Sequence, residues 1–135
     1  MIVAPGKPAF LYDPNAQHMV ALILTKVDPV YITEARNAFN RYNKEIYYNK
    51  TYQISNVALS DTVRMMTISS FENANAAIAY MEKARKAAPG ELIPWLPAAK
   101  YSFVIVTDAN LGKLQENKDV DTYKLFLQQL FPGKF

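Results

Sequence analysis

Four stretches of the chain show the apolar pattern of β-strands. Met19–Lys26 is apolar on both faces, so we expect it to occupy a central position in a sheet. Thr51–Leu59 alternates with a change of parity that indicates a bulge near Ser55-Asn56, and a short turn joins it to Val63–Phe71. Tyr101–Thr107 alternates throughout. We predict one antiparallel hairpin and two further strands.

Two stretches show the three- and four-residue spacing of amphipathic helices. The first begins at Asp28-Pro29, because Asp can cap free N–H groups and Pro has no N–H to leave unpaired in the first turn. The second begins near Asn73 and ends before Pro89-Gly90. The two apolar stripes are expected to be Ile32, Ala35, Phe39, Tyr42 and Ile46, and then Ala74, Ala77, Ile78, Met81, Ala84 and Arg85. We predict that both helices cover a sheet.

The last part of the chain is read as an extension of this domain. After a turn at 108–110 we expect a short strand over Leu111–Glu116, followed by a helix from about Asp119. The apolar stripe of that helix is Val120, Tyr123, Leu127, Leu130 and Phe131, with Phe126 at its side. Such a stripe is too apolar to leave in water, so the helix should be part of the fold.

The order strand, helix, strand, strand, helix, strand predicts a ferredoxin-like α+β fold, βαββαβ. In that plan a four-stranded antiparallel sheet carries two helices on one face, and here a C-terminal strand and helix extend it. Residues 1–17 contain three prolines and are predicted to form a linker or an extended arm. Residues 18–135 are predicted to form the single domain.

Composition narrows the classes of function. The chain has no cysteine, which excludes disulfides, thiol nucleophiles and thiolate metal sites. Its net charge of +3 comes from scattered basic residues, so the case for nucleic acid is weak. The longest apolar run, Met19–Leu24, is too short to cross a membrane.

No set of residues has the spacing of a catalytic or cofactor site. His18 is the single histidine and has no acidic neighbour in the sequence, so we interpret it as structural or solvent-facing. The acidic residues fall at helix starts, in turns or on polar helix faces, and the four glycines do not form a phosphate loop. The strands that would stack bases in an RNA-recognition domain, Met19–Thr25 and Val63–Ser69, have no interior aromatic residue. We predict no catalytic residue, no cofactor and no metal.

Three tyrosines at the junction between the first helix and the second strand are the candidate recognition surface. Tyr47, Tyr48 and Tyr52 combine apolar rings with polar hydroxyls, which suits recognition of a peptide or a glycan. The alternative is that the rings pack at the edge of the sheet with their hydroxyls in water.

A series of segments resembles a known family. The segments are Tyr52–Leu59, Ile68–Asn75 leading to Ala79-Tyr80, and Phe103–Val106 followed by Asn110-Leu111, Lys118-Asp119, Tyr123 and Phe126. They resemble the C-terminal domain found after tetratricopeptide repeats in envelope proteins of the Bacteroidota, including gliding-motility and type IX secretion lipoproteins. The resemblance runs from about Phe10 to Phe131. It implies a periplasmic or lipoprotein context and a non-enzymatic role in assembly, and it supplies no catalytic residue.

We therefore expect a protein–protein interaction or assembly module of a larger envelope protein. Its partner would be another protein, or a second copy that docks through the sheet face free of helices. Two other classes stay open. One is a small dimeric ferredoxin-like enzyme of the monooxygenase kind, with an apolar cavity between sheet and helices, and the other is a glycan-binding domain of the sporulation-related-repeat type.

Overall fold

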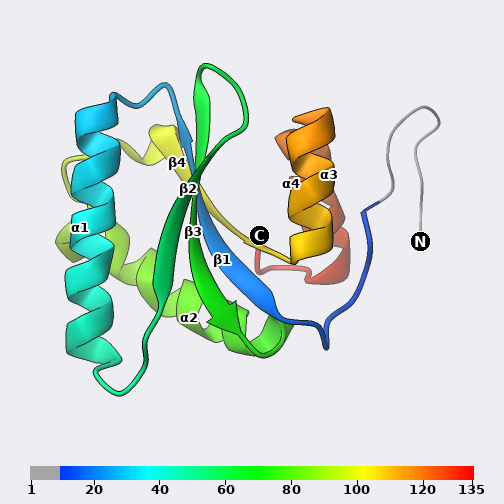
Figure 1. Cartoon of the computed structure of the whole chain (residues 1–135), viewed down its shortest axis with the longest axis horizontal. Helices are drawn as coiled ribbons and strands as arrows, with labels where there is room; N and C mark the ends of the chain where they lie inside the picture. The colour runs from blue at the N-terminus through cyan, green and yellow to red at the C-terminus, as the bar shows by residue number, and fades with distance from the viewer. Residues whose placement is uncertain (1–9) are drawn as a thin grey trace.

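The computed structural model describes residues 10–135, which form an α+β domain with a four-stranded antiparallel sheet between two helical layers (Figure 1). The strand order is β2-β3-β1-β4. The elements are β1 (His18–Thr25), α1 (Pro29–Ile46), β2 (Gln53–Ala58), β3 (Val63–Phe71), α2 (Ala74–Ala87), β4 (Tyr101–Val106), α3 (Asp108–Asn117) and α4 (Val120–Leu130). The predicted order of the first six elements is confirmed.

Strand β1 lies inside the sheet, paired antiparallel with β3 on one side and β4 on the other. Its Leu22 is opposite Met66 of β3 and Phe103 of β4. Val20 and Leu24 are fully buried along with it, as the apolar run predicted. Each such side chain contributes about 1.5–3 kcal/mol through burial, so β1 anchors the core.

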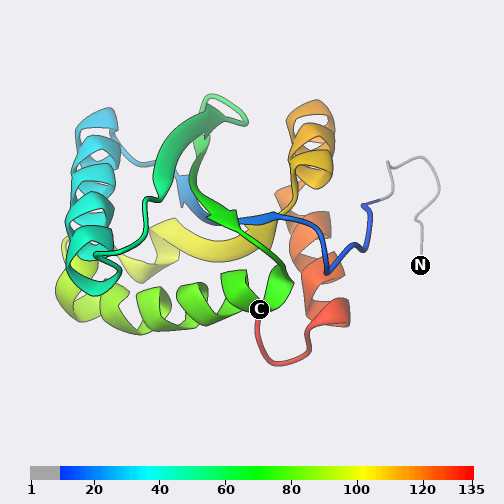
Figure 2. The same ribbon diagram turned by 60° about the horizontal axis from the view of Figure 1, so that its bottom comes forward.

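Helices α1 and α2 form the first layer, on one face of the sheet (Figure 2). The Phe39 ring of α1 lies 6.3 Å from that of Phe103, and Ala77 and Ala84 of α2 are fully buried, which lets this helix approach closely. Two predicted stripe positions are wrong: Ile46 is 51 % exposed and Arg85 is exposed. Ile46 is the last residue of α1.

The predicted short strand over Leu111–Glu116 is wrong, because these residues belong to α3. Thr107 caps the helix, its hydroxyl accepting a hydrogen bond from the N–H of Asn110 at 3.2 Å. Leu111 and Leu114 are three residues apart and lie on the inner side of the helix, Leu114 fully buried. Gly112 lies inside α3, where a single glycine costs only about 1 kcal/mol relative to alanine.

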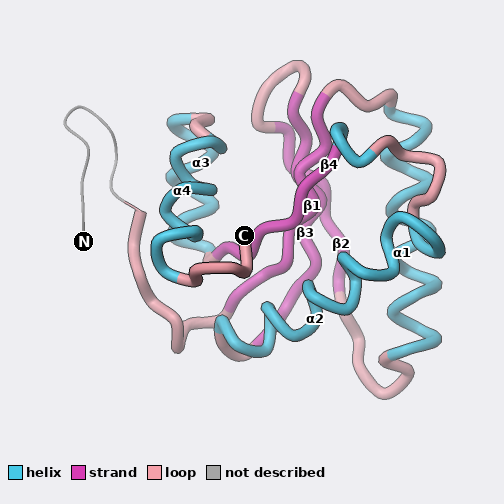
Figure 3. The backbone as a smooth tube through the Cα atoms, turned by 180° about the vertical axis from the view of Figure 1, so that it is seen from behind, coloured by secondary structure: helices cyan, strands magenta, loops and turns pink. Residues whose placement is uncertain are grey.

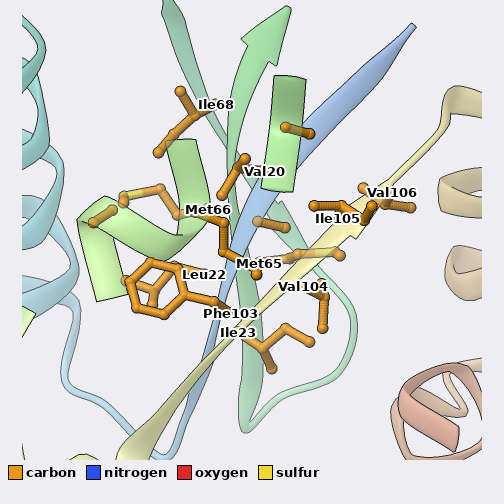
Figure 4. Packing of buried hydrophobic residues seen from close by; sticks show 14 of the residues in the cluster. Val20, Leu22, Ile23, Met65, Met66, Ile68, Phe103, Val104, Ile105 and Val106 are labelled. Carbon is orange, nitrogen blue, oxygen red and sulfur yellow. The ribbon is translucent and has the colours of Figure 1, made fainter. Parts of the chain in front are cut away.

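Helices α3 and α4 form a second layer on the opposite face (Figure 3). Val104 and Val106 point toward this layer while Leu22 and Phe103 point to the other (Figure 4). Tyr123 and Leu127 of α4 are buried, which agrees with the predicted stripe. We expected this face of the sheet to be free of helices. That expectation is wrong, because the extension covers β1 and β4 there.

The chain before β1 also packs on this second layer. Phe10 is buried, with its ring 4.7 Å from that of Tyr123, and Leu11 makes two main-chain hydrogen bonds to the side chain of Asn110. Part of the predicted arm thus contributes to the core, whereas residues 1–9 of it lie outside the described residues. Within residues 10–135, no helix is long and apolar enough to cross a membrane.

Candidate functional site: a tyrosine-lined pocket

The end of α1 and the turn after it position the predicted tyrosines. The N–H of Tyr47 donates to the carbonyl of Asn43 at 2.9 Å, and the N–H of Lys50 donates to the carbonyl of Tyr47 at 2.9 Å. This turn reverses the chain into β2, so Tyr47 and Tyr52 come to lie against each other with ring centroids 5.7 Å apart. Tyr48, the residue after Tyr47, is 85 % exposed.

Tyr47 and Tyr52 join two aromatic residues from other elements. Tyr80 of α2 lies 5.3 Å from Tyr47 and 5.5 Å from Tyr52, measured between ring centroids. Phe71, at the end of β3, stacks on Tyr52 at 5.0 Å. Such ring pairs contribute about 0.5–1.5 kcal/mol beyond their burial, so the cluster holds its geometry.

These four rings line an open pocket of about 480 Å³. Ala76 and Ala79 of α2 also line it, and their small side chains leave room for a ligand. Lys50, Lys83 and Glu72 also line the pocket. The lysine side chains are exposed, so their charges are available to a ligand. The pocket offers ring faces together with a small excess of positive charge.

Burial sets the protonation of the tyrosines. It raises the pKa of Tyr80 far above its ordinary value, with smaller contributions from Tyr42 and Tyr47. It also raises the pKa values of Tyr47 and Tyr52. All of these hydroxyls are therefore neutral at physiological pH, and the pocket's tyrosines act as hydrogen-bonding groups and stacking surfaces.

A buried polar contact supports Tyr80 from behind. Its hydroxyl donates a hydrogen bond to the side-chain oxygen of Asn43, a residue of α1 that is itself buried. The side-chain nitrogen of Asn43 is buried without a hydrogen-bond partner among the described residues. The contact links α1 to α2 and fixes the tilt of the Tyr80 ring in the pocket wall.

The other residues considered from the sequence take structural positions. His18 is buried at the start of β1, with its Nδ1 2.8 Å from the carbonyl oxygen of Ala16. Asp119 caps α4 by accepting from the N–H of Thr122 at 3.1 Å, whereas Asp28 starts α1 without a side-chain hydrogen bond. Among residues 10–135 no three His, Asp or Glu side chains gather as a metal site would require.

Sequence reasoning found two of the four rings. It missed Tyr80, although Ala77, Tyr80 and Ala84 have the spacing of one helix face and all are buried. It also missed Phe71, which ends β3 and gave no signal that it would meet Tyr52 across the sheet. Tyr48, which was grouped with the other two, lies outside the cluster.

Known proteins show little similarity to this chain. No family model and no curated protein matches it. Among solved structures, the de novo designed protein Ferredog-Diesel is similar with a TM-score of 0.40 and 11 % sequence identity, and the match covers 79 % of this chain and 100 % of that one. Nothing in these comparisons connects the chain with the tetratricopeptide-repeat envelope proteins, so that resemblance stays a prediction.

Proposed function

We propose that this chain is a non-catalytic interaction module that holds a segment of another protein in the tyrosine-lined pocket. The observation that carries the proposal is the cluster of Tyr47, Tyr52, Phe71 and Tyr80 around an open pocket with lysines at its side. We also propose that the first six elements follow the ferredoxin-like plan, with α3 and α4 as an added layer. Placement in a bacterial envelope protein rests on the sequence resemblance alone.

The chemistry of the pocket suits a peptide segment. Tyrosine rings offer a large contact area with few rotatable bonds, so binding costs little side-chain entropy. Lys50 and Lys83 favour a carboxylate on the ligand, because charge-assisted hydrogen bonds are about twice as strong as neutral ones. The expected ligand therefore carries an aromatic, proline or aliphatic side chain next to an acidic residue.

Selection of peptides from a phage-displayed random library tests the proposal. We expect the domain to enrich peptides that place an acidic residue beside an apolar one. Their affinity should fall at least about tenfold in Tyr52→Ala, since truncating a residue at the centre of a binding site costs about 2 kcal/mol or more. Tyr48→Ala is the matched control, because it removes a neighbouring ring outside the pocket, and its affinity should match that of the unsubstituted domain.

A glycan is the second candidate, because the half-exposed rings of Tyr47 and Tyr52 could also stack on the faces of sugars. Titration with defined cell-wall oligosaccharides separates the two. If these sugars bind in a way that depends on Tyr52 and the peptide selection fails, the pocket binds glycans and the peptide proposal is wrong.

A further inference from the structure

The outer edge of β4 is a second surface with the features of a binding site. β4 is the last strand in the order β2-β3-β1-β4, so it has one strand neighbour. The main-chain N–H of Lys26, just after β1, donates to the carbonyl of Thr62 at 2.7 Å, on the β3 side. Antiparallel strands alternate between hydrogen-bonded and non-bonded pairs. By this alternation Ala21 of β1 bonds to Val104 of β4, and the main chain of Phe103 faces outward.

An independent contact supports this orientation. Ile105 has the same parity as Phe103, and its carbonyl oxygen accepts a hydrogen bond from the Tyr123 hydroxyl of α4 at 2.6 Å. Tyr123 thus satisfies one outward group at one end of the strand. The main-chain N–H and C=O of Phe103 also point outward. Among the described residues, no helix, loop or C-terminal residue forms a hydrogen bond with either group. An unpaired strand edge is a template for another strand.

The edge lies along a groove of about 390 Å³ between two walls. Arg85 and Pro89 contribute to the wall on the α2 side, and Lys124 and Gln128 to the wall on the α4 side. The C-terminal segment leads from the end of α4 to α2. It is tied there by Arg85, which donates to the carbonyl of Lys134 at 2.8 Å. Both charged residues that line the groove, Arg85 and Lys124, are basic.

We propose that an extended, acidic segment of a partner protein adds to β4 as a fifth strand of the sheet. Its main chain pairs with Tyr101 and Phe103, and its carboxylates face Arg85 and Lys124. The charges select this occupant over a second copy of the chain. Two-fold pairing of β4 with itself would bring the basic walls of both copies together, and like charges in an interface are unfavourable. The site is separate from the tyrosine-lined pocket and does not depend on it, so one domain would hold two partner segments.

Peptide selection on the Tyr52→Ala variant tests this site with the first pocket disabled. We expect peptides with alternating apolar residues and at least one Asp or Glu. A synthetic copy of the peptide that binds most tightly should bind the Lys124→Glu variant at least about tenfold more weakly than it binds the domain without this change, the parent. Lys44→Glu makes the same charge change on the exposed end of α1 and should bind like the parent. Equal thermal midpoints of the two charge variants exclude unfolding as the cause.

Two measurements on the same peptide separate strand addition from side-chain docking. N-methylation removes main-chain N–H donors from the peptide. Methylating every second residue can be done in two ways, and the one that removes the donors facing β4 should abolish binding. Hydrogen exchange should show at least about tenfold protection of the Phe103 amide on binding and no change at Val104, which already pairs with β1. Binding that survives methylation in both registers, or an unchanged affinity in Lys124→Glu, overturns the proposal. Light scattering without peptide tests the remaining alternative. A dimer that becomes stronger in Lys124→Glu would assign the edge to a second copy instead.

Discussion

The two helical layers hold the sheet by different means. α1 and α2 bury apolar stripes against one face, with Phe39 on Phe103 as the central contact. The second layer adds polar side chains that donate to main-chain carbonyls: Tyr123 of α4 to Ile105 and Lys118, just after α3, to Leu59, both at 2.6 Å. The comparison shows that a short extension can become an integral layer when it satisfies main-chain groups at the sheet's margin as well as burying rings.

The largest expected effect tests whether the second layer belongs to the core. Tyr123→Ala should lower the free energy of unfolding by about 3–5 kcal/mol, the usual cost of truncating a buried aromatic residue. Phe39→Ala in the first layer should cost a similar amount. Urea melts of both variants measure the contrast. A loss of under about 0.5 kcal/mol in Tyr123→Ala would mean that α4 is a loose appendage.

A subtler substitution isolates the polar part of the second layer. Tyr123→Phe keeps the ring and removes the hydroxyl, leaving the Ile105 carbonyl without this donor. The expected loss is about 1–3 kcal/mol, the cost of an unsatisfied buried group. Tyr12→Phe is the control, because Tyr12 is 55 % exposed, and its urea midpoint should not move. Equal stability of Tyr123→Phe and the parent would show that apolar packing alone holds this layer.

Asn110 tests how the segment before β1 is fastened. Its side chain accepts from the N–H of Leu11 at 2.8 Å and donates to the Leu11 carbonyl at 2.9 Å. Asn110→Ala should cost about 1–2 kcal/mol and speed hydrogen exchange at Leu11. Asn37→Ala, at an exposed position of α1, should leave both unchanged. An unaltered Leu11 exchange rate in Asn110→Ala would mean that the packing of Phe10 fastens the segment by itself.

The smallest effect near neutral pH concerns ionisation. The pKa values of Tyr80 and Tyr123 are raised by burial from the ordinary value of 10.0. A raised folded-state pKa contributes stability that is fully present below pH 10 and is lost as the pH rises above it, because the unfolded chain releases these protons first. Spectroscopic titration of tyrosinate should therefore show these two residues ionising together with unfolding. Ionisation of both in a chain that keeps its folded circular dichroism would contradict this.

The sequence predicted the first layer better than the second. The stripes of α1 and α2 repeat over many turns, and the run in β1 is apolar on both faces, so local periodicity was sufficient there. The segment Leu111–Glu116 is too short to show whether its apolar residues repeat with the spacing of a strand or of a helix. Thr107, which caps the helix, was the better indication of α3. The contact of Asn110 with Leu11 joins residues far apart in sequence, and a single sequence gives no rule for such a pair.

The same limit applies to the candidate site. Tyr47 and Tyr52 were found because they lie close in sequence, and Tyr48 was included for that reason alone. Tyr80 and Phe71 reach the pocket through the docking of α2 and the end of β3, so only the tertiary structure joins them. Residues that are close in sequence can be grouped in advance, and they make up half of this cluster. The other half depends on how the elements pack.

Calorimetric titration of the library-selected peptide into the parent domain, Tyr52→Ala and Tyr48→Ala tests the central claim most directly. The account predicts that the dissociation constant rises at least about tenfold in Tyr52→Ala and stays within about twofold of the parent in Tyr48→Ala. Equal affinities in all three proteins, or an equal loss in both variants, would contradict the assignment of the tyrosine-lined pocket as the binding site.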